Sequence, residues 1–278
     1  MTKGITLSIG LNSVDPKHYG GWSGDLNACE ADAADVADIA KSSGFKTETL
    51  LTKAATRKNV IQAFGKAAGS LKAGDIFLLF YSGHGGQVPD MNNDEDDYQD
   101  ETWCLYDGEL IDDEINELLS RVAKGVRVFS LSDSCHSGTV TKAAFYQGTM
   151  GARSAGIGPN PPRLKFMPPD VALRTYRQNQ KFYEKILKDP KLTKAQDNVK
   201  ASVMLISGCQ DNQYSSDGTF NSLFTANLLA VWNHGHFKKN YTDFHKAIIK
   251  RMPPDQTPNY FWVGTHDRKF ERQTPFTV

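Results

Sequence analysis

The stretch that decides the fold is GDIFLLFYSGHG, residues 74–85, in which an apolar run ends in small residues and a histidine. A second run, VRVFSLSDSCHSG (126–138), ends in the same way and delivers Asp133, Cys135 and His136. The first run is apolar at nearly every position, which is typical of a strand that helices cover on both faces. Two such strands, each followed by small residues and a reactive side chain, indicate a functional site.

These two runs belong to a longer alternation of strand-like and helix-like segments. Helical spacing of apolar and small residues begins at Leu26, at Thr56 (a good N-cap) and, in a shorter segment, at Asp112. Strands and helices in alternation predict an α/β fold with a mostly parallel sheet and helices on both faces. The predicted strands are 4–11, 46–51, 75–81, 126–133, 201–208 and 258–264, and the longer predicted helices are 26–42, 56–71, 170–188, 222–233 and 242–251.

Composition excludes several classes of function. Lys plus Arg equal Asp plus Glu at 32 each, so no global charge attracts the chain to nucleic acid or to a membrane. No apolar run is long enough for a spanning helix, and the N-terminus lacks the pattern of a signal peptide. Four scattered cysteines in 278 residues do not form a disulfide framework. We therefore expect a cytoplasmic globular protein with no nucleic-acid or membrane partner.

His84 and Cys135 form the candidate catalytic pair. Ligands bind beyond the carboxyl ends of the strands in open parallel sheets, and both residues follow such ends. An imidazole can take the proton of a thiol nucleophile and later protonate a leaving amine. Gly83 and Gly85 allow close approach of a substrate backbone. The backbone N–H groups of Gly85 and Cys135 are the natural donors to the oxyanion of an acyl-transfer intermediate.

Other interpretations of these residue types are weaker. His136 follows Cys135 directly, so on an extended backbone it points the other way and is a poor base for that thiol. A zinc site lacks the usual ligand spacing, and no metal cage or phosphate loop supports a nuclease or another hydrolase. Inert packing or surface roles are expected for the remaining cysteines and histidines, namely Cys29, Cys104, Cys209, His18, His234, His236, His245 and His266.

The YSGHG block (81–85) and the DSCHSG block (133–138) resemble the two signature motifs of metacaspases and their bacterial relatives, which are caspase-like cysteine peptidases. The 51 residues from His84 to Cys135 are also similar to the spacing in caspases. The resemblance is strongest over 4–139 and weaker from 202 to the end. It implies one caspase-like domain over 1–278, an α/β/α sandwich around a sheet of about six strands. Within it, 1–141 is large-subunit-like, 142–200 is a basic insertion or lid, and 201–278 is small-subunit-like.

The resemblance also implies an activity, which is cleavage of peptides or proteins after Arg or Lys through a thioester. Three residues match the family's substrate pocket, namely Asp32, Ser82 and Asp133. The physical logic agrees, because carboxylates beside a pocket favour a cationic side chain and disfavour an anionic one. The alternatives are a solvated helix charge for Asp32 and a turn cap for Asp133. For the whole chain, the alternative is a non-catalytic caspase-like scaffold or an effector that a partner activates.

Calcium is the cofactor that the resemblance brings into question. Asp100, Asp112 and Asp113 match three of the family's aspartate ligands, and oxygen-rich sites suit this ion. The fourth position falls at or near Lys142, where a cation opposes a dication. We therefore expect no required cofactor and treat calcium as an open possibility. The acidic loop 90–101 offers further oxygens or is simply a solvated loop.

The segment 150–200 is basic, with eleven Lys and Arg against four acids. It leaves the predicted fourth strand just after Cys135, so it starts beside the site, and long excursions in compact domains usually have a purpose. We expect it to lie across the cleft as a lid or a self-cleavage loop, or else to be a plain surface insertion with a docked helix. Arg153, Arg163 and Lys165 lie in its irregular part and are the expected cut points.

Overall fold

A computed structural model describes residues 2–91, 99–135, 163–193, 195–209 and 215–278. Its main sheet has six strands in the order β2-β1-β3-β7-β8-β9. All neighbours pair in parallel except β8 and β9, which are antiparallel. The prediction of a mostly parallel, six-stranded α/β fold is confirmed. The strands are β1 (Gly4–Gly10), β2 (Lys46–Leu51), β3 (Ile76–Ser82), β7 (Arg127–Asp133), β8 (Ser202–Ser207) and β9 (Asn259–Gly264).

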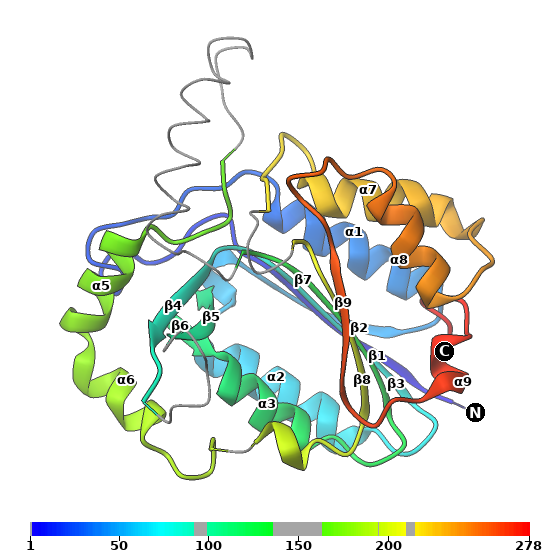
Figure 1. Ribbon diagram of the computed structural model, residues 1–278, viewed down its shortest axis with the longest axis horizontal. Coiled ribbons are helices and arrows are strands. Elements are labelled where there is room, and N and C mark those ends of the chain that lie inside the picture. The colour runs from blue at the N-terminus through cyan, green and yellow to red at the C-terminus, as the bar shows by residue number, and fades with distance from the viewer. Residues whose placement is uncertain (1, 92–98, 136–162, 194, 210–214) are drawn as a thin grey trace.

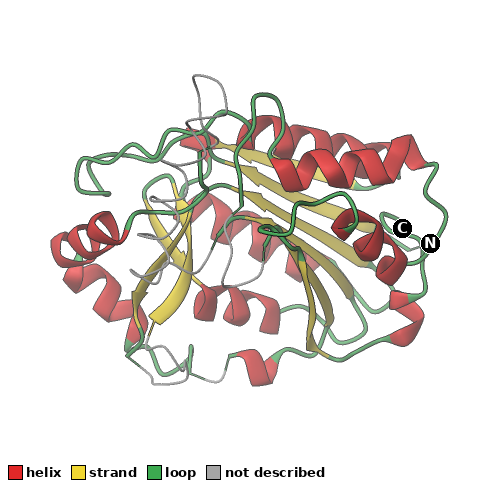
Figure 2. Ribbon diagram, turned by 45° about the horizontal axis from the view of Figure 1, so that its top comes forward, coloured by secondary structure: helices red, strands yellow, loops and turns green. Residues whose placement is uncertain are grey.

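Helices cover both faces of this sheet (Figures 1 and 2). One face carries α1 (Cys29–Ser42), α7 (Leu223–Trp232) and α8 (Tyr241–Ile249), and the other carries α2 (Arg57–Ser70) and α3 (Asp112–Ser120). The short α9 (Arg268–Glu271) lies near the two chain ends. Of the helices in the part of the chain that the structure describes, none has the length and apolar character to cross a membrane.

The strand β3 shows why its sequence lacks polar alternation. Phe77, Leu79 and Tyr81 pack into the core that includes α2 and α3, whereas Leu78 and Phe80 pack into the core that includes α1 and α7. Every residue of the strand is buried. A strand between two apolar cores needs apolar side chains on both faces, so the continuous run was a reliable signal.

A second, antiparallel sheet was not predicted. It consists of β4 (Gly85–Pro89), β5 (Gln99–Leu105) and β6 (Gly108–Ile111). The expectation of a loop over 90–101 is wrong for its last three residues, which begin β5, while 92–98 lie outside the described residues. The polar start of β5 hides its strand character, because its apolar residues begin only at Trp103, although Asp100 is also buried.

The predicted helix 170–188 is a pair of helices, α5 (Pro169–Gln178) and α6 (Gln180–Leu187). Asn179 leaves helical geometry between them, with φ −113° and ψ 23°. Its side-chain amide donates to the carbonyls of His18 and Thr175, both at 2.9 Å, which holds the break in place. The pair packs beside the second sheet, where Tyr183 contributes to a small apolar cluster.

Glu109 is a buried carboxyl between the second sheet and α6. Its Oε2 accepts a 2.6 Å hydrogen bond from Thr102 Oγ1, and its backbone N–H donates to the Tyr183 hydroxyl at 3.2 Å. The same hydroxyl lies 2.7 Å from His18 Nε2. Burial raises the pKa of Glu109 to about 7, although Thr102, Tyr183 and Arg57 act in the opposite direction.

Glu109→Gln is expected to flatten the pH dependence of stability. The folded pKa of about 7 exceeds the ordinary 4.5, so the carboxyl's stabilising contribution is complete below pH 4.5 and is lost as pH rises through 7. The free energy of unfolding should fall by an amount on the order of 3 kcal/mol, and a neutral glutamine should not show this fall. Thermal unfolding near pH 5 and near pH 8 measures the difference, with Glu48→Gln on the surface as the control. An equal loss of stability between the two pH values in wild type and in Glu109→Gln would contradict the raised pKa of Glu109.

Candidate active site

The parallel register of β3 and β7 brings the two motifs together. Ser82 at the end of β3 lies opposite Asp133 at the end of β7, and His84 and Cys135 each follow two residues later. Both side chains are buried, with 5% of His84 and 0% of Cys135 exposed. The His84 carbonyl accepts hydrogen bonds from the Tyr81 hydroxyl at 2.7 Å and from the Cys104 N–H at 2.9 Å. The loop that carries the histidine is therefore fixed.

The imidazole of His84 is held in a form suited to accept a proton. Nε2 lies 2.9 Å from the carbonyl oxygen of Gly24, and the ring packs against Trp22 with centroids 4.7 Å apart. Burial lowers the pKa of His84 to about 4, while the backbones of Gly24 and Phe166 act in the opposite direction. The imidazole is thus neutral at pH 7. Gly24 has φ +55° and a side chain there would reach 3.0 Å from the His84 ring, so this position requires glycine.

The backbone around Cys135 presents two N–H donors to one carbonyl oxygen. The N–H groups of Cys135 and Gly85 both donate to the carbonyl oxygen of Lys165, each at 3.1 Å. These are the two donors that the sequence predicted. The sulfur accepts a hydrogen bond from the Ser215 N–H and lies 3.6 Å from the Ser215 carbonyl oxygen. A carbonyl held by two N–H donors beside a thiol has the arrangement that acyl transfer requires.

The segment 163–167 crosses the site, with isolated β-bridges at Leu164 and Phe166 on either side of a bend at Lys165. On one edge, Lys165 N–H donates to the Ser215 carbonyl at 3.0 Å, and Asp217 N–H donates to the Arg163 carbonyl at 2.8 Å. On the other edge, Met167 N–H donates to the Gly85 carbonyl at 2.8 Å. Main-chain hydrogen bonds to a strand edge are how proteins bind peptide ligands by strand addition. The segment therefore has main-chain partners of the kind that a bound peptide has.

The side chain of Lys165 enters a pocket made by the three residues predicted to bind substrate. Its Nζ lies 2.7 Å from Ser82 Oγ, 3.3 Å from Asp32 Oδ2 and 3.2 Å from Asp133 Oδ2. Asp32 comes from α1, and the other two come from the ends of β3 and β7. Three separate elements therefore converge on one ammonium group. The structure brings these residues together with His84, Gly85 and Cys135 in one cleft.

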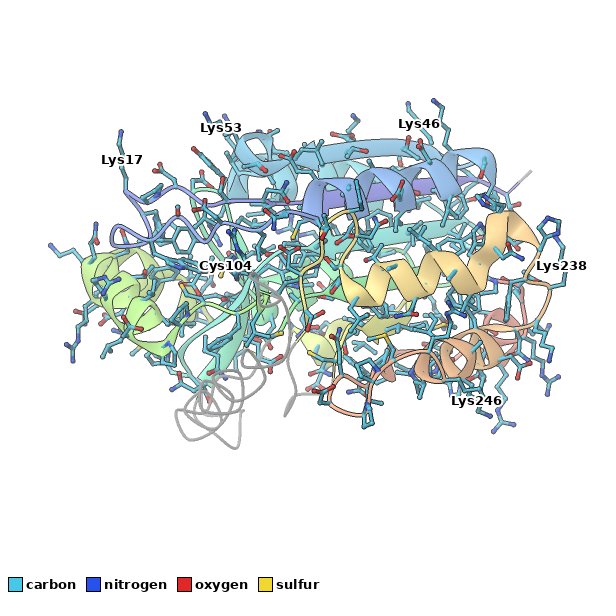
Figure 3. The ribbon with its side chains drawn as sticks, turned by 90° about the horizontal axis from the view of Figure 1, so that it is seen from above. Lys17, Lys46, Lys53, Cys104, Lys238 and Lys246 are labelled. Atoms are coloured by element: carbon cyan, nitrogen blue, oxygen red, sulfur yellow. The ribbon has the colours of Figure 1, made fainter. Side chains whose placement is uncertain are left out.

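Complete burial of a lysine is unusual. The lysines labelled in Figure 3 point away from the body of the protein, whereas Lys165 is 0% exposed. Burial alone lowers the pKa of Lys165, but Asp133, Cys29 and Asp32 reverse this shift and hold the pKa above its ordinary value. Lys165 is therefore charged, and its charge is compensated by two carboxylates.

Neighbours from a distant part of the chain hold these carboxylates in place. Asp133 accepts hydrogen bonds from Ser215 Oγ at 2.5 Å and Thr225 Oγ1 at 2.8 Å. Asp32 accepts from the Ser222 N–H at 2.9 Å and from the Ser222 hydroxyl. Burial raises the pKa of Asp133, and the Lys165 ammonium opposes that shift. These supporting residues could not be found from the sequence, because a single hydroxyl in a loop or a helix carries no signal of its partner.

Two cysteines that the sequence analysis treated as inert lie at the site. Burial raises the pKa of Cys29 to about 12, and the opposing effects of Lys165 and Ser82 place this thiol beside the pocket. Cys209 packs with Cys135 in one buried cluster. Cys209 follows β8 after a small residue, in the sequence ISGC, so the strand-end rule that identified Cys135 could have found it.

The three aspartates considered for calcium do not assemble into a metal site. Asp100 lies on β5, and Asp112 and Asp113 open α3. Among the described residues, no group of three or more His, Cys, Asp and Glu side chains is placed to hold a metal ion. The fourth expected position, at or near Lys142, lies outside those residues, as do His136 and Arg153. Calcium binding stays a prediction, and no chemical step proposed below uses it.

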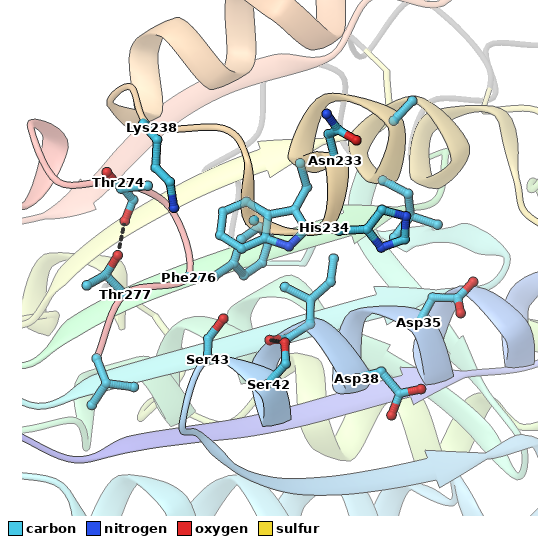
Figure 4. A pocket seen from close by; sticks show the side chains of 16 residues that line it. Asp35, Asp38, Ser42, Ser43, Asn233, His234, Lys238, Thr274, Phe276 and Thr277 are labelled. Atoms are coloured by element: carbon cyan, nitrogen blue, oxygen red, sulfur yellow. Dashed lines mark hydrogen bonds between the residues drawn. The ribbon is translucent and has the colours of Figure 1, made fainter.

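A surface pocket of about 1220 Å³ lies elsewhere, between α1, α7 and the C-terminal residues (Figure 4). Its lining mixes acidic, aromatic and hydroxyl side chains, among them Asp35, Asp38, Trp232 and Phe276. None of the predicted site residues lines it. The candidate site is instead the cleft that the chain itself fills.

Comparison with known proteins identifies the family to which the chain belongs. The family model described as the caspase domain matches residues 13–273. Metacaspase-1A of Neurospora crassa is 30% identical over 251 residues, which cover 79% of this chain and 52% of that protein. Metacaspase-1 of Schizosaccharomyces pombe is 28% identical over 257 residues, 80% of this chain and 57% of that protein. The chain thus spans about half the length of the curated relatives it matches.

A solved structure is similar over the whole chain. The crystal structure of protein GSU0716 from Geobacter sulfurreducens has a TM-score of 0.87 and 58% sequence identity, and the match covers 99% of both chains. The caspase-domain model covers all of the cleft residues, from Asp32 through Ser82, His84 and Cys135 to Ser222. The resemblance read from the two motifs is confirmed, and the chain belongs to the caspase-domain family of peptidases, with metacaspases among its relatives.

Proposed function

We propose that this chain is a cysteine endopeptidase that cleaves peptides or proteins after Lys or Arg. Cys135 is the nucleophile, and His84 is the general base and acid. One observation carries the proposal, which is the position of Lys165. Its ammonium group lies in the acidic pocket while its carbonyl oxygen accepts both the Gly85 and the Cys135 N–H groups. A residue bound in this way is held as a substrate residue before the cut.

The reaction follows from these positions. His84 takes the thiol proton, and the Cys135 sulfur attacks the carbonyl carbon of the residue in the pocket. The oxyanion that forms is stabilised by the two N–H donors. The C–N bond then breaks, His84 protonates the leaving amine, and a thioester remains on Cys135. Water, deprotonated by His84, hydrolyses the thioester and restores the thiol.

The pocket explains the selectivity for a cation. Asp32 and Asp133 are both fully buried, and Lys165 is the cation that lies between them. An apolar substrate residue would leave two carboxylates buried without a charge partner, and an aspartate would add a third negative charge. Leaving a buried charge uncompensated costs about 3–5 kcal/mol. Discrimination against both classes should therefore be large.

The same geometry makes the intact chain its own inhibitor and its own first substrate. Lys165 fills the pocket that a substrate needs, so the Lys165–Phe166 bond is the bond presented to Cys135. Arg163, also considered as a cut point, does not enter the pocket, because its guanidinium donates to the Asp25 carbonyl at 2.7 Å. A filled cleft also fits the alternative that the protein is an effector whose cleft a partner opens. Turnover of small peptides by the protein alone distinguishes a peptidase from such an effector.

A panel of fluorogenic peptides that differ only at the residue before the cut tests the specificity. Lys and Arg peptides should be cleaved at least about a hundredfold faster than Asp or Leu peptides, since at least about 3 kcal/mol separates them. Cys135→Ala should abolish turnover and remain folded. A preference for Asp or Leu, or activity in folded Cys135→Ala, would refute the assignment. Running the panel with and without calcium tests the expectation that no cofactor is required.

Self-cleavage is tested by mapping fragments of intact protein against Cys135→Ala. We expect a cut between Lys165 and Phe166 in the active protein alone. Lys165→Ala removes the ammonium anchor, so it should expose Cys135 to a thiol-alkylating reagent and abolish the cut. Lys181→Ala, an exposed lysine of α6, is the matched control and should behave as wild type. Alkylation of Cys135 at equal rates in both variants would show that Lys165 does not close the cleft.

The pH profile tests the role of His84. In the filled cleft its pKa is about 4 instead of 6.5, because burial disfavours the charged ring. A substrate fills the cleft in the same way, so the imidazole should stay neutral, and kcat should hold, down to roughly pH 4–5. The pH dependence of kcat/KM reports the pKa of His84 in the free enzyme. In the free enzyme the cleft is open and hydrated, so activity on the acid side should fall at a pH closer to 6.5. An acid limb of kcat near 6.5 would show that the histidine is not desolvated by substrate.

A further inference from the structure

The floor of the cleft contains two thiols in one cluster. Cys135 and Cys209 pack together, with Leu164 and Phe166 of the crossing segment against them. They follow neighbouring parallel strands, since Ser132 of β7 lies opposite Ser207 of β8. Cys209 Sγ lies 3.6 Å from the carbonyl oxygen of Ser134, the residue just before Cys135. Neither cysteine is in a disulfide in this structure.

This placement suits a disulfide. Neighbouring strands lie about 4.8 Å apart, and the two cysteines are staggered by one residue relative to the paired serines. A disulfide accepts Cα separations of about 4.4–6.8 Å. The crossbridge would join two loops that directly follow the paired strands β7 and β8.

We propose that Cys209 is a resolving thiol that captures an oxidised Cys135 as a disulfide and so locks the opened cleft reversibly. The oxidant is a hydroperoxide, with hydrogen peroxide as the simplest member of the class. The inference rests on the proposed function, because it uses the reactivity of Cys135 as a nucleophile. It assigns a role to a cysteine that the peptidase mechanism leaves unused.

The chemistry balances in two steps. The Cys135 thiolate attacks one oxygen of hydrogen peroxide, so an S–O bond forms, the O–O bond breaks, and the released hydroxide takes a proton to become water. The sulfur loses two electrons and is now a sulfenic acid. The Cys209 sulfur then attacks the Cys135 sulfur, the S–S bond forms, the S–O bond breaks, and a second water leaves. A dithiol reductant returns both cysteines to thiols.

The segment 163–167 controls when Cys135 can be oxidised. Cys135 is 0% exposed and Cys209 is 4% exposed while Leu164 and Phe166 pack against them. The reagent reaches the thiols only when this segment leaves, so oxidation should act on the opened enzyme and spare the intact chain. The oxidised sulfur would otherwise continue to sulfinic acid, which ordinary thiols do not reduce. Cys209 thus protects the nucleophile from irreversible loss.

The experiment uses full-length Lys165→Ala, once alkylation of Cys135 has shown that its cleft is open without any cut. After hydrogen peroxide, peptide mapping under non-reducing conditions should show Cys135 linked to Cys209 with the loss of two hydrogens, and dithiothreitol should reverse it. Adding Cys209→Ala should leave Cys135 with two extra oxygens and at least about tenfold more thiol that dithiothreitol cannot recover. Cys104→Ala is the matched control, because Cys104 lies in a different cluster, and it should behave as the parent.

Each outcome decides the proposal. Full recovery of Cys135 in the Cys209→Ala protein, or a disulfide from Cys135 to Cys29, overturns it. Should Cys209→Ala fail a circular-dichroism check of folding, Cys209→Ser makes the same test with a side chain of similar size. The readout is mass and not turnover. A Cys135–Cys209 disulfide in a protein without peptidase activity would refute the proposed function alone, and an active peptidase without the disulfide would refute the lock alone.

Discussion

The ammonium of Lys165 between two buried carboxylates is the interaction on which the cleft depends. It joins the N-terminal turn of α1, the ends of β3 and β7, and the segment that leads into α5. Neither carboxylate would be stable in this position as an uncompensated charge, because desolvation of an ion costs several kcal/mol. While it is closed to water, the pocket therefore needs a cation, and in the intact chain the protein supplies its own.

The need for a cation connects substrate selectivity with autoinhibition. The carboxylates that select a cationic substrate also bind Lys165 of the chain itself, so a pocket that binds one tightly also binds the other tightly. The hydroxyls of Ser215, Ser222 and Thr225 matter here, because they satisfy the carboxylate oxygens that the ammonium does not reach. Since these residues lie near the start of α7, the small-subunit-like part of the chain completes a pocket that the large-subunit-like part begins.

The sequence predicted the parts of this cleft that depend on local pattern. His84, Cys135 and the Gly85 N–H follow from apolar strands that end in small residues, because parallel strands bring such ends together. The resemblance to metacaspases supplied the pocket aspartates. The choice of Lys165 among the three expected cut points could not be predicted, because it depends on which residue lies over Cys135 once α5 has docked. The second sheet was hidden for a related reason, since its short strands gain their stability from tertiary packing and carry little intrinsic signal.

The anchoring of Met167 has a consequence for what a cut achieves. Its N–H donates to Gly85, and its side chain is buried with Val14, Tyr19 and Cys104. Gly86 makes room for it, because a β-carbon there would come within 2.7 Å of Met167 Cε. After cleavage the new amino group of Phe166 therefore stays tethered beside the thioester. If Cys135 cuts there as proposed, an amine so confined has a high effective molarity and would compete with water for the thioester. The anchoring of Met167 would therefore slow the completion of the cut until α5 leaves the site.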